Sequence, residues 1–168
     1  VARKRMGYTA YGNALTAAKG LGILKTSSSI YKCTIDGTSF KYTTTGSWTS
    51  VGSVTYTADK ETAFTQVKGK LFVWNGTQGG SYFDGSTLSQ PGTIPKGKFS
   101  IYYNSFHIAS GVDGQLSRIH IATLADPTDF TNAATTLNNS TEVPGASVFA
   151  GTGANYIDIQ PEDGDYIT

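Results

Sequence analysis

Short runs of alternating hydrophobic and polar residues follow one another along the chain, and each pair of runs flanks a turn dipeptide. Asp-Gly and Asn-Gly accept the positive φ of tight hairpin turns at little cost. The turns that stand between such runs are Asp36-Gly37, Asn75-Gly76, Asp84-Gly85, Asn104-Ser105 and Asp113-Gly114. Alternating runs on both sides of a turn dipeptide predict β-hairpins, and consecutive hairpins predict an antiparallel meander.

Helical patterns are scarce in this sequence. Residues 13–22 form an Ala-rich stretch that predicts one short helix, although its glycines weaken the pattern. Residues 126–132 predict a single helical turn with Asp126 as N-cap and Pro127 at the first helical position. Proline and glycine predict loops at 89–97 and 140–147.

The expected strands fall into groups near residues 30–57, 62–89 and 98–137, and a fourth group begins at residues 147–160. A spacing of about 40 residues is typical of β-propeller blades. We therefore expect an all-β fold in which antiparallel meander blades form part of a β-propeller, with residues 1–168 as one region of a longer protein. No motif recurs in register apart from an aromatic strand with its turn dipeptide, so a β-sandwich remains the alternative.

The composition agrees with an all-β protein, because 12% of the residues are aromatic and 20 are glycine. The charge is divided unevenly: residues 1–98 carry 12 Lys and Arg against 4 Asp and Glu, a net +8, whereas residues 99–168 carry a net −7. This division predicts head-to-tail pairing with copies of the chain or with a charged neighbour. The alternative is that surface lysines happen to fall early in the chain.

The cysteine content and the lengths of the apolar stretches argue against a disulfide-linked or membrane-inserted protein. Cys33 is the single cysteine, so no disulfide forms within the chain, and its alternating surroundings predict a small buried side chain. The sequence has no apolar stretch of about 18 residues, so we expect no membrane insertion.

The stretch "SRIHIATLADPTDF" (117–130) carries several residues that also occur in active sites. Alternation places Arg118 and His120 on one face of a strand, where His120 could neighbour His107. Two histidines and an aspartate could bind a metal, but the sequence does not show clearly which residue would be the third ligand, so the signal for a metal site is weak. We instead expect Asp126 to cap a turn, Pro127 to end the strand and Phe130 to fold back onto the core.

Other candidate chemistry is equally weak. The spacing of Asp158, Glu162, Asp163 and Asp165 does not fit an EF-hand loop and favours a solvated turn. Residues 33–40 resemble the Asp-box of sialidase-type propellers but lack one residue between Asp36 and Gly37, so this stretch favours a hairpin. The sequence motifs of hydrolases, nucleotide-binding loops and dinucleotide-binding folds are missing. We therefore predict no catalytic, cofactor-binding or metal-binding residue, no cofactor and no enzymatic activity.

Aromatic residues offer one alternative role. A sugar-binding surface could be built from some of them, although most Trp and Phe in β-proteins belong to the core. The residues considered are Trp48, Trp74, Tyr82, Phe83, Tyr102 and Tyr103.

Four stretches taken together resemble one group of proteins. They are "RKRMGYTAYGN" (3–13), "LFVWNGTQGGSYFDGSTL" (71–88), "SFHIASGVDGQLSRIHIATLADPTDFTN" (105–132) and "IDIQPEDGDYIT" (157–168). Their order is similar to that in β-propeller virion proteins of tailed bacteriophages, which include tail-tube nozzle, DNA-stabilisation and minor tail proteins. Met6 stands where that group commonly has proline, and Thr123 where it commonly has serine.

The resemblance implies a structural component of the virion, in the tail or in the connector below the portal. The implied partners are other virion proteins of the tail, portal or adaptor and copies of the chain itself. A glycan- or receptor-binding module of a phage tail, with a host-surface glycan as ligand, is the first alternative. A propeller-type glycoside hydrolase is the second, and it is disfavoured because no carboxylate pair stands out.

Overall fold

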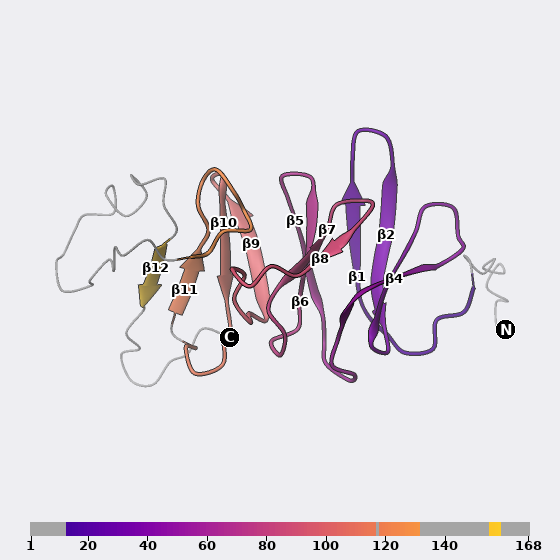
Figure 1. The fold of residues 1–168 in the computed structure, drawn as a ribbon, viewed down its shortest axis with the longest axis horizontal. Helices are drawn as coiled ribbons and strands as arrows, with labels where there is room; N and C mark the ends of the chain where they lie inside the picture. The colour runs from indigo at the N-terminus through magenta and orange to yellow at the C-terminus, as the bar shows by residue number, and fades with distance from the viewer. Residues whose placement is uncertain (1–12, 117, 132–154, 159–168) are drawn as a thin grey trace, which may run out of the picture.

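The described part of the protein is built from three four-stranded antiparallel sheets that lie side by side (Figure 1). The computed structural model describes residues 13–116, 118–131 and 155–158, and these residues contain strands, turns and loops but no helix. The all-β class and the antiparallel meander predicted from the hydrophobic pattern are confirmed.

Sheet A consists of the first four strands in chain order. They are β1 (Ala18–Lys25), β2 (Ile30–Asp36), β3 (Ser39–Thr43) and β4 (Thr49–Thr55). The helix predicted for residues 13–22 is wrong, because Ala18 begins a strand that pairs with β2. Its glycines suit a β-bulge between Lys19 and Gly22, where the register shifts, and they are poor helix formers.

Sheets B and C repeat the same meander. Sheet B contains β5 (Ala63–Val67), β6 (Lys70–Trp74), β7 (Ser81–Phe83) and β8 (Leu88–Ser89). Sheet C contains β9 (Phe99–Tyr103), β10 (Phe106–Ser110), β11 (Arg118–Ile121) and β12 (Asn155–Asp158). All the hairpins predicted around turn dipeptides are confirmed.

The fourth strand group expected at residues 147–160 is not a separate sheet in the described part of the chain. Its strand β12 pairs antiparallel with β11 and completes sheet C instead. The sequence pattern could not show this, because the sheet that a strand joins depends on its partner rather than on its own alternation.

The first core lies between sheets A and B. Buried side chains of sheet A, among them Leu24, Ile35 and Phe40, pack against Leu71 and Phe83 of sheet B. Cys33 belongs to this core, as predicted, and burial raises the pKa of its thiol to about 12. A thiol in this setting stays protonated at neutral pH and acts as a small hydrophobic group.

The second core lies between sheets B and C and makes sheet B the central layer. Along β6, Leu71 and Val73 belong to the first core, whereas Phe72 and Trp74 belong to the second. The consecutive hydrophobic residues of "LFVW" are thus explained by a strand that is buried on both faces. Figure 1 shows sheet B between the other two sheets.

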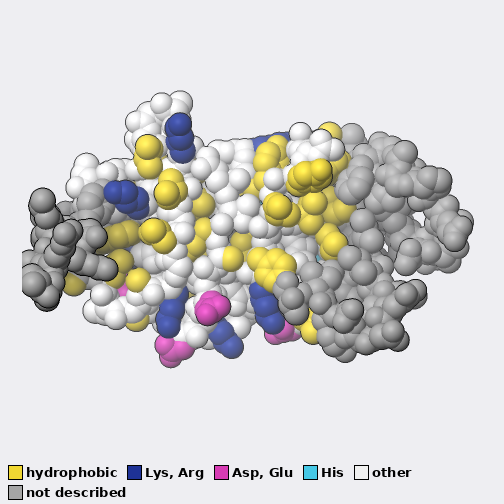
Figure 2. All heavy atoms as spheres, turned by 180° about the vertical axis from the view of Figure 1, so that it is seen from behind, with side chains coloured by type: hydrophobic (Ala, Val, Ile, Leu, Met, Phe, Trp, Pro, Cys, Tyr) yellow, Lys and Arg dark blue, Asp and Glu magenta, His cyan; other side chains and the backbone are white. Residues whose placement is uncertain are grey.

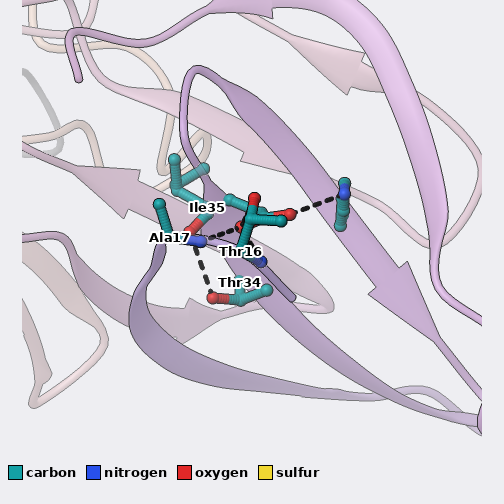
Figure 3. Close-up of polar contacts among 6 residues, drawn as sticks. Thr16, Ala17, Thr34 and Ile35 are labelled. Carbon is teal, nitrogen blue, oxygen red and sulfur yellow. Dashed lines mark hydrogen bonds and ion pairs between the residues drawn. The ribbon is translucent and has the colours of Figure 1, made fainter. Parts of the chain in front are cut away.

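A buried carboxylate fastens the chain that leads into β1 onto sheet A. Asp36 Oδ1 accepts hydrogen bonds from the Thr16 N–H at 2.9 Å and the Ala17 N–H at 2.6 Å. Its Oδ2 accepts a hydrogen bond from the Lys41 ammonium at 2.6 Å. Figure 3 shows Thr16 and Ala17 beside the strand that carries Ile35. The Lys41 hydrogen bond, followed by that of Ala17, lowers the pKa of Asp36 to about 2.

Candidate interaction surfaces

The polar residues singled out in "SRIHIATLADPTDF" do not converge on an active site. His120 lies opposite Ala109, and the Ala122 N–H donates to the carbonyl of His107, so the two histidines are offset diagonally rather than paired. Among the residues that the structure describes, no group of three His, Cys, Asp or Glu side chains is placed to hold a metal ion.

His107 is a residue of the second core. Its side chain is almost fully buried, and its ring lies 4.2 Å from that of Phe72, centroid to centroid. Nδ1 donates to the carbonyl oxygen of Pro127 at 2.7 Å, and the Ser100 hydroxyl lies 3.0 Å from Nε2. Burial lowers the pKa of His107 to about 4, although the hydrogen bond to Pro127 opposes this effect. The imidazole is therefore neutral at physiological pH.

The segment after β11 forms the turn that the sequence predicts, but not the helical turn. Pro127 does not end the strand, because β11 already ends at Ile121. Asp126 Oδ1 accepts from the Thr128 N–H at 2.9 Å, and the Asp129 N–H donates to the Asp126 carbonyl at 3.2 Å. These bonds close a tight turn without starting a helix, because the aspartate itself satisfies the free N–H group. Phe130 then packs edge-on against Trp74, as expected.

The aromatic residues considered as a sugar platform are dispersed. Trp74 and Phe83 are buried in different cores, and Trp48 and Tyr82 are half-buried. Tyr102 and Tyr103 are exposed at the end of β9, and Tyr103 retains 68% of its accessible surface. These residues do not form one common surface.

The face of sheet C that points away from sheet B carries hydrophobic side chains, of which Ile101 is exposed. His107 and Ala109 point toward sheet B, so the alternate residue Ile108 points away from it. Ile108 pairs with Ile101 on one side and with Ile121 on the other, giving an aliphatic row across three strands.

This row borders an apolar hollow of about 330 Å³, which we call the sheet C hollow. Its lining includes Phe99, Ile101, Ile108 and Ile119. Ile101 remains 56% exposed. Ile108 and Ile119 are half-buried and Ile121 is buried, so Ile101 is the exposed residue of this group. An exposed aliphatic side chain at an apolar hollow is a candidate contact point for a partner.

Sheet A carries a second apolar surface on its opposite, outward side. Ile23 and Ile30 are 55% and 54% exposed, and they pair across the strands with Lys32 and Lys25 respectively. Since Leu24 points into the first core, its neighbours Ile23 and Lys25 point outward. The outward face of sheet A therefore combines aliphatic and basic side chains.

A cleft of about 500 Å³ with a mixed polar and apolar lining lies where β5 and β9 begin, and we call it the β5–β9 cleft. It is lined by residues 60–63 and 75–77 together with Lys98, Phe99 and Asp113. Charged side chains of both signs gather along the lower edge of the molecule in Figure 2. The sequence patterns gave no signal for this cleft, because its residues come from four separate segments.

Several residues named from the sequence lie outside the described residues. These are residues 3–12 of the first stretch that carries the resemblance, the loop predicted at 140–147, and Glu162, Asp163 and Asp165. Nothing is described of the Asp158 side chain. Within the described part of the chain, no helix long and apolar enough to cross a membrane is found.

Neither a protein-family model, nor a curated protein, nor a solved structure matches the chain.

Proposed function

We propose that this chain is a structural component of a bacteriophage virion, built from consecutive blades of a β-propeller. It acts through rigid shape and through docking of its end sheets, with copies of itself and other virion proteins as partners. The sheet C hollow and the exposed Ile101 beside it are the observation that carries the docking role. The virion assignment rests on the resemblance of the four sequence stretches.

The arrangement of the sheets supports a propeller more than a two-layer sandwich. Each sheet is a meander of four strands, and the first strands β1, β5 and β9 lie next to one another. Propellers typically place about 4–8 four-stranded blades around a channel. Three sheets in a row, with the middle one buried on both faces, fit a sector of such a ring.

The partner proposed for the sheet C hollow is the outward face of sheet A in a second copy. Both faces are aliphatic, and the basic residues Lys25 and Lys32 flank Ile23 and Ile30 on sheet A. Residues 99–168 carry a net −7 and residues 1–98 a net +8, and this difference in charge favours a contact between the two halves of neighbouring copies. Such a heterologous contact produces a ring or a filament.

Mass spectrometry of purified tailed-phage particles that encode this sequence tests the virion role. We expect its peptides in intact particles, where they remain after high-salt washing and co-purify with portal or tail proteins. If the peptides are found only in the soluble lysate of infected cells and never in particles, the proposed function is wrong.

A further inference from the structure

The third surface described above, the β5–β9 cleft, is lined by charged, hydroxyl-bearing and apolar residues. We propose that it binds a neutral oligosaccharide, an activity that goes beyond the structural role and does not depend on it. A volume of about 500 Å³ lies within the range of about 300–1,000 Å³ that is usual for ligand pockets.

The charges that line the cleft balance one another. Lys60 and Lys98 supply two ammonium groups, and Glu61 and Asp113 supply two carboxylates. An anionic ligand would meet the carboxylates, and a cationic ligand would meet the ammonium groups. A sugar hydroxyl both donates and accepts hydrogen bonds, so a neutral ligand with many hydroxyls can use groups of both signs.

The cleft also has an apolar part. Ala63 and Phe99 line it beside the charged side chains, and Phe99 also lines the sheet C hollow. Sugar rings present C–H groups on one face, and such a face packs favourably on an aromatic or aliphatic surface. Polar groups together with an apolar patch are therefore what a sugar ring requires.

Lys98 is held in position by two glycines. A Cβ atom on Gly76 would lie 2.8 Å from Lys98 Cγ, and one on Gly111 would lie 2.9 Å from Lys98 Cβ. The lysine stem thus packs on bare backbone, and its ammonium lies 3.6 Å from Asp113 Oδ1. The packing restricts the stem of Lys98, whereas its side chain as a whole is 52% exposed, so the ammonium group remains accessible to a ligand.

The loop that faces Lys98 is braced as well. Asn75 Oδ1 accepts from the Thr77 N–H at 3.1 Å and the Gln78 N–H at 3.2 Å. The Gly76 N–H donates to the Gly97 carbonyl at 2.9 Å, which ties this loop to the segment before β9. The cleft walls are therefore fixed to each other.

NMR titration of the ¹⁵N-labelled chain with maltotriose, cellotriose, a galactose trimer and a trigalacturonic acid tests the inference. We expect at least one neutral trimer to shift the amides of Gly76, Thr77 and Asp113, with affinity nearly independent of salt. Lys98→Met and Asp113→Asn should each weaken binding about tenfold. Lys25→Met, on the outward face of sheet A, should leave it unchanged.

A glycine pair tests whether the position of Lys98 matters. Gly76→Ala should displace Lys98 and weaken binding. Gly69 has the same φ of 77°, but a Cβ atom there would meet no atom within 4 Å, so Gly69→Ala should leave binding unchanged. The inference is wrong if no neutral trimer shifts these amides, if the cleft variants bind like the wild type, or if only the acidic sugar binds. None of these results bears on self-association or on incorporation into particles.

Discussion

The imidazole of His107 and the carbonyl of Pro127 form a 2.7 Å hydrogen bond that links the centre of sheet C to the Asp-Pro turn after β11. The same ring packs against Phe72 of sheet B. One neutral side chain thus fastens a loop to the interface between two sheets, and its protonation state should affect stability.

Lowering the pH should destabilise the fold through His107. The pKa of His107 is about 4 in the folded protein, whereas a histidine in the unfolded chain has a pKa of 6.5. The unfolded chain therefore takes up the proton first as the pH falls. The contribution of neutral His107 to the free energy of unfolding should be fully present above pH 6.5. It should be lost as the pH falls from 6.5 to 4, and the total loss should be about 3 kcal/mol. Urea denaturation across this range measures the loss.

His107→Gln is the control for this effect. It removes the titrating group and should flatten the pH dependence between 6.5 and 4, although it lowers stability at pH 7. If the variant shows the same pH dependence as the wild type, His107 is not its origin.

Asp36 should stabilise the start of β1. Asp36→Ala leaves the N–H groups of Thr16 and Ala17 without their acceptor, and we expect a loss of about 1–3 kcal/mol in the free energy of unfolding. Asp59→Asn changes a carboxylate that is 91% exposed and should cost less than about 0.5 kcal/mol.

The same carboxylate should contribute to acid sensitivity at a lower pH than His107. Because the pKa of Asp36 is about 2 in the folded state and 3.8 ordinarily, its stabilisation is complete above pH 3.8 and is lost as the pH falls toward 2. Denaturation midpoints of wild type and Asp36→Ala should converge in this range. Midpoints that stay equally far apart at pH 2 and pH 7 would contradict this assignment.

Close packing between sheets A and B should make Gly22 sensitive to substitution. A Cβ atom there would lie 2.6 Å from the ring of Phe64, so Gly22→Ala should destabilise the protein by about 1–3 kcal/mol. Gly52→Ala, in β4, meets no atom within 4 Å and should have little effect. Thermal unfolding of both variants checks the difference, and equal melting temperatures would refute it.

The central position of sheet B should make both faces of β6 important. Leu71→Ala should cost about 2–5 kcal/mol and Phe72→Ala about 3–5 kcal/mol, since each opens a cavity in a different core. Leu21→Ala, at a position that is 69% exposed, serves as control. A small loss at either β6 position would show that the corresponding core is not closely packed.

Hairpins could be predicted from the sequence because each depends on a turn dipeptide and its immediate flanks. Asp36-Gly37 and Asn104-Ser105 are such local signals, and Gly37, Asn104 and Ser105 adopt positive φ. The alternation of hydrophobic and polar residues does not predict strand β1, because a bulge at Gly20 and Leu21 interrupts it. The sheet joined by β12 depends on pairing with β11, which no local pattern specifies.

Features of the surface were harder to predict than the fold. Burial of His107 and the two-layer packing of "LFVW" depend on neighbours from other sheets. The β5–β9 cleft combines Lys60, Lys98 and Asp113 from separate loops, so no linear motif marks it. Alternation did place Arg118 and His120 on one strand face, but it could not show which sheet that face meets.

Self-association measured by sedimentation velocity tests the docking claim most directly. The wild type should form head-to-tail oligomers that weaken as salt rises, because opposite charges are screened. Ile101→Glu, beside the sheet C hollow, should sediment as a monomer, whereas Thr45→Glu, an exposed change between β3 and β4, should associate like the wild type. A wild type that stays monomeric at high concentration and low salt, or an Ile101→Glu variant that associates normally, would contradict the account.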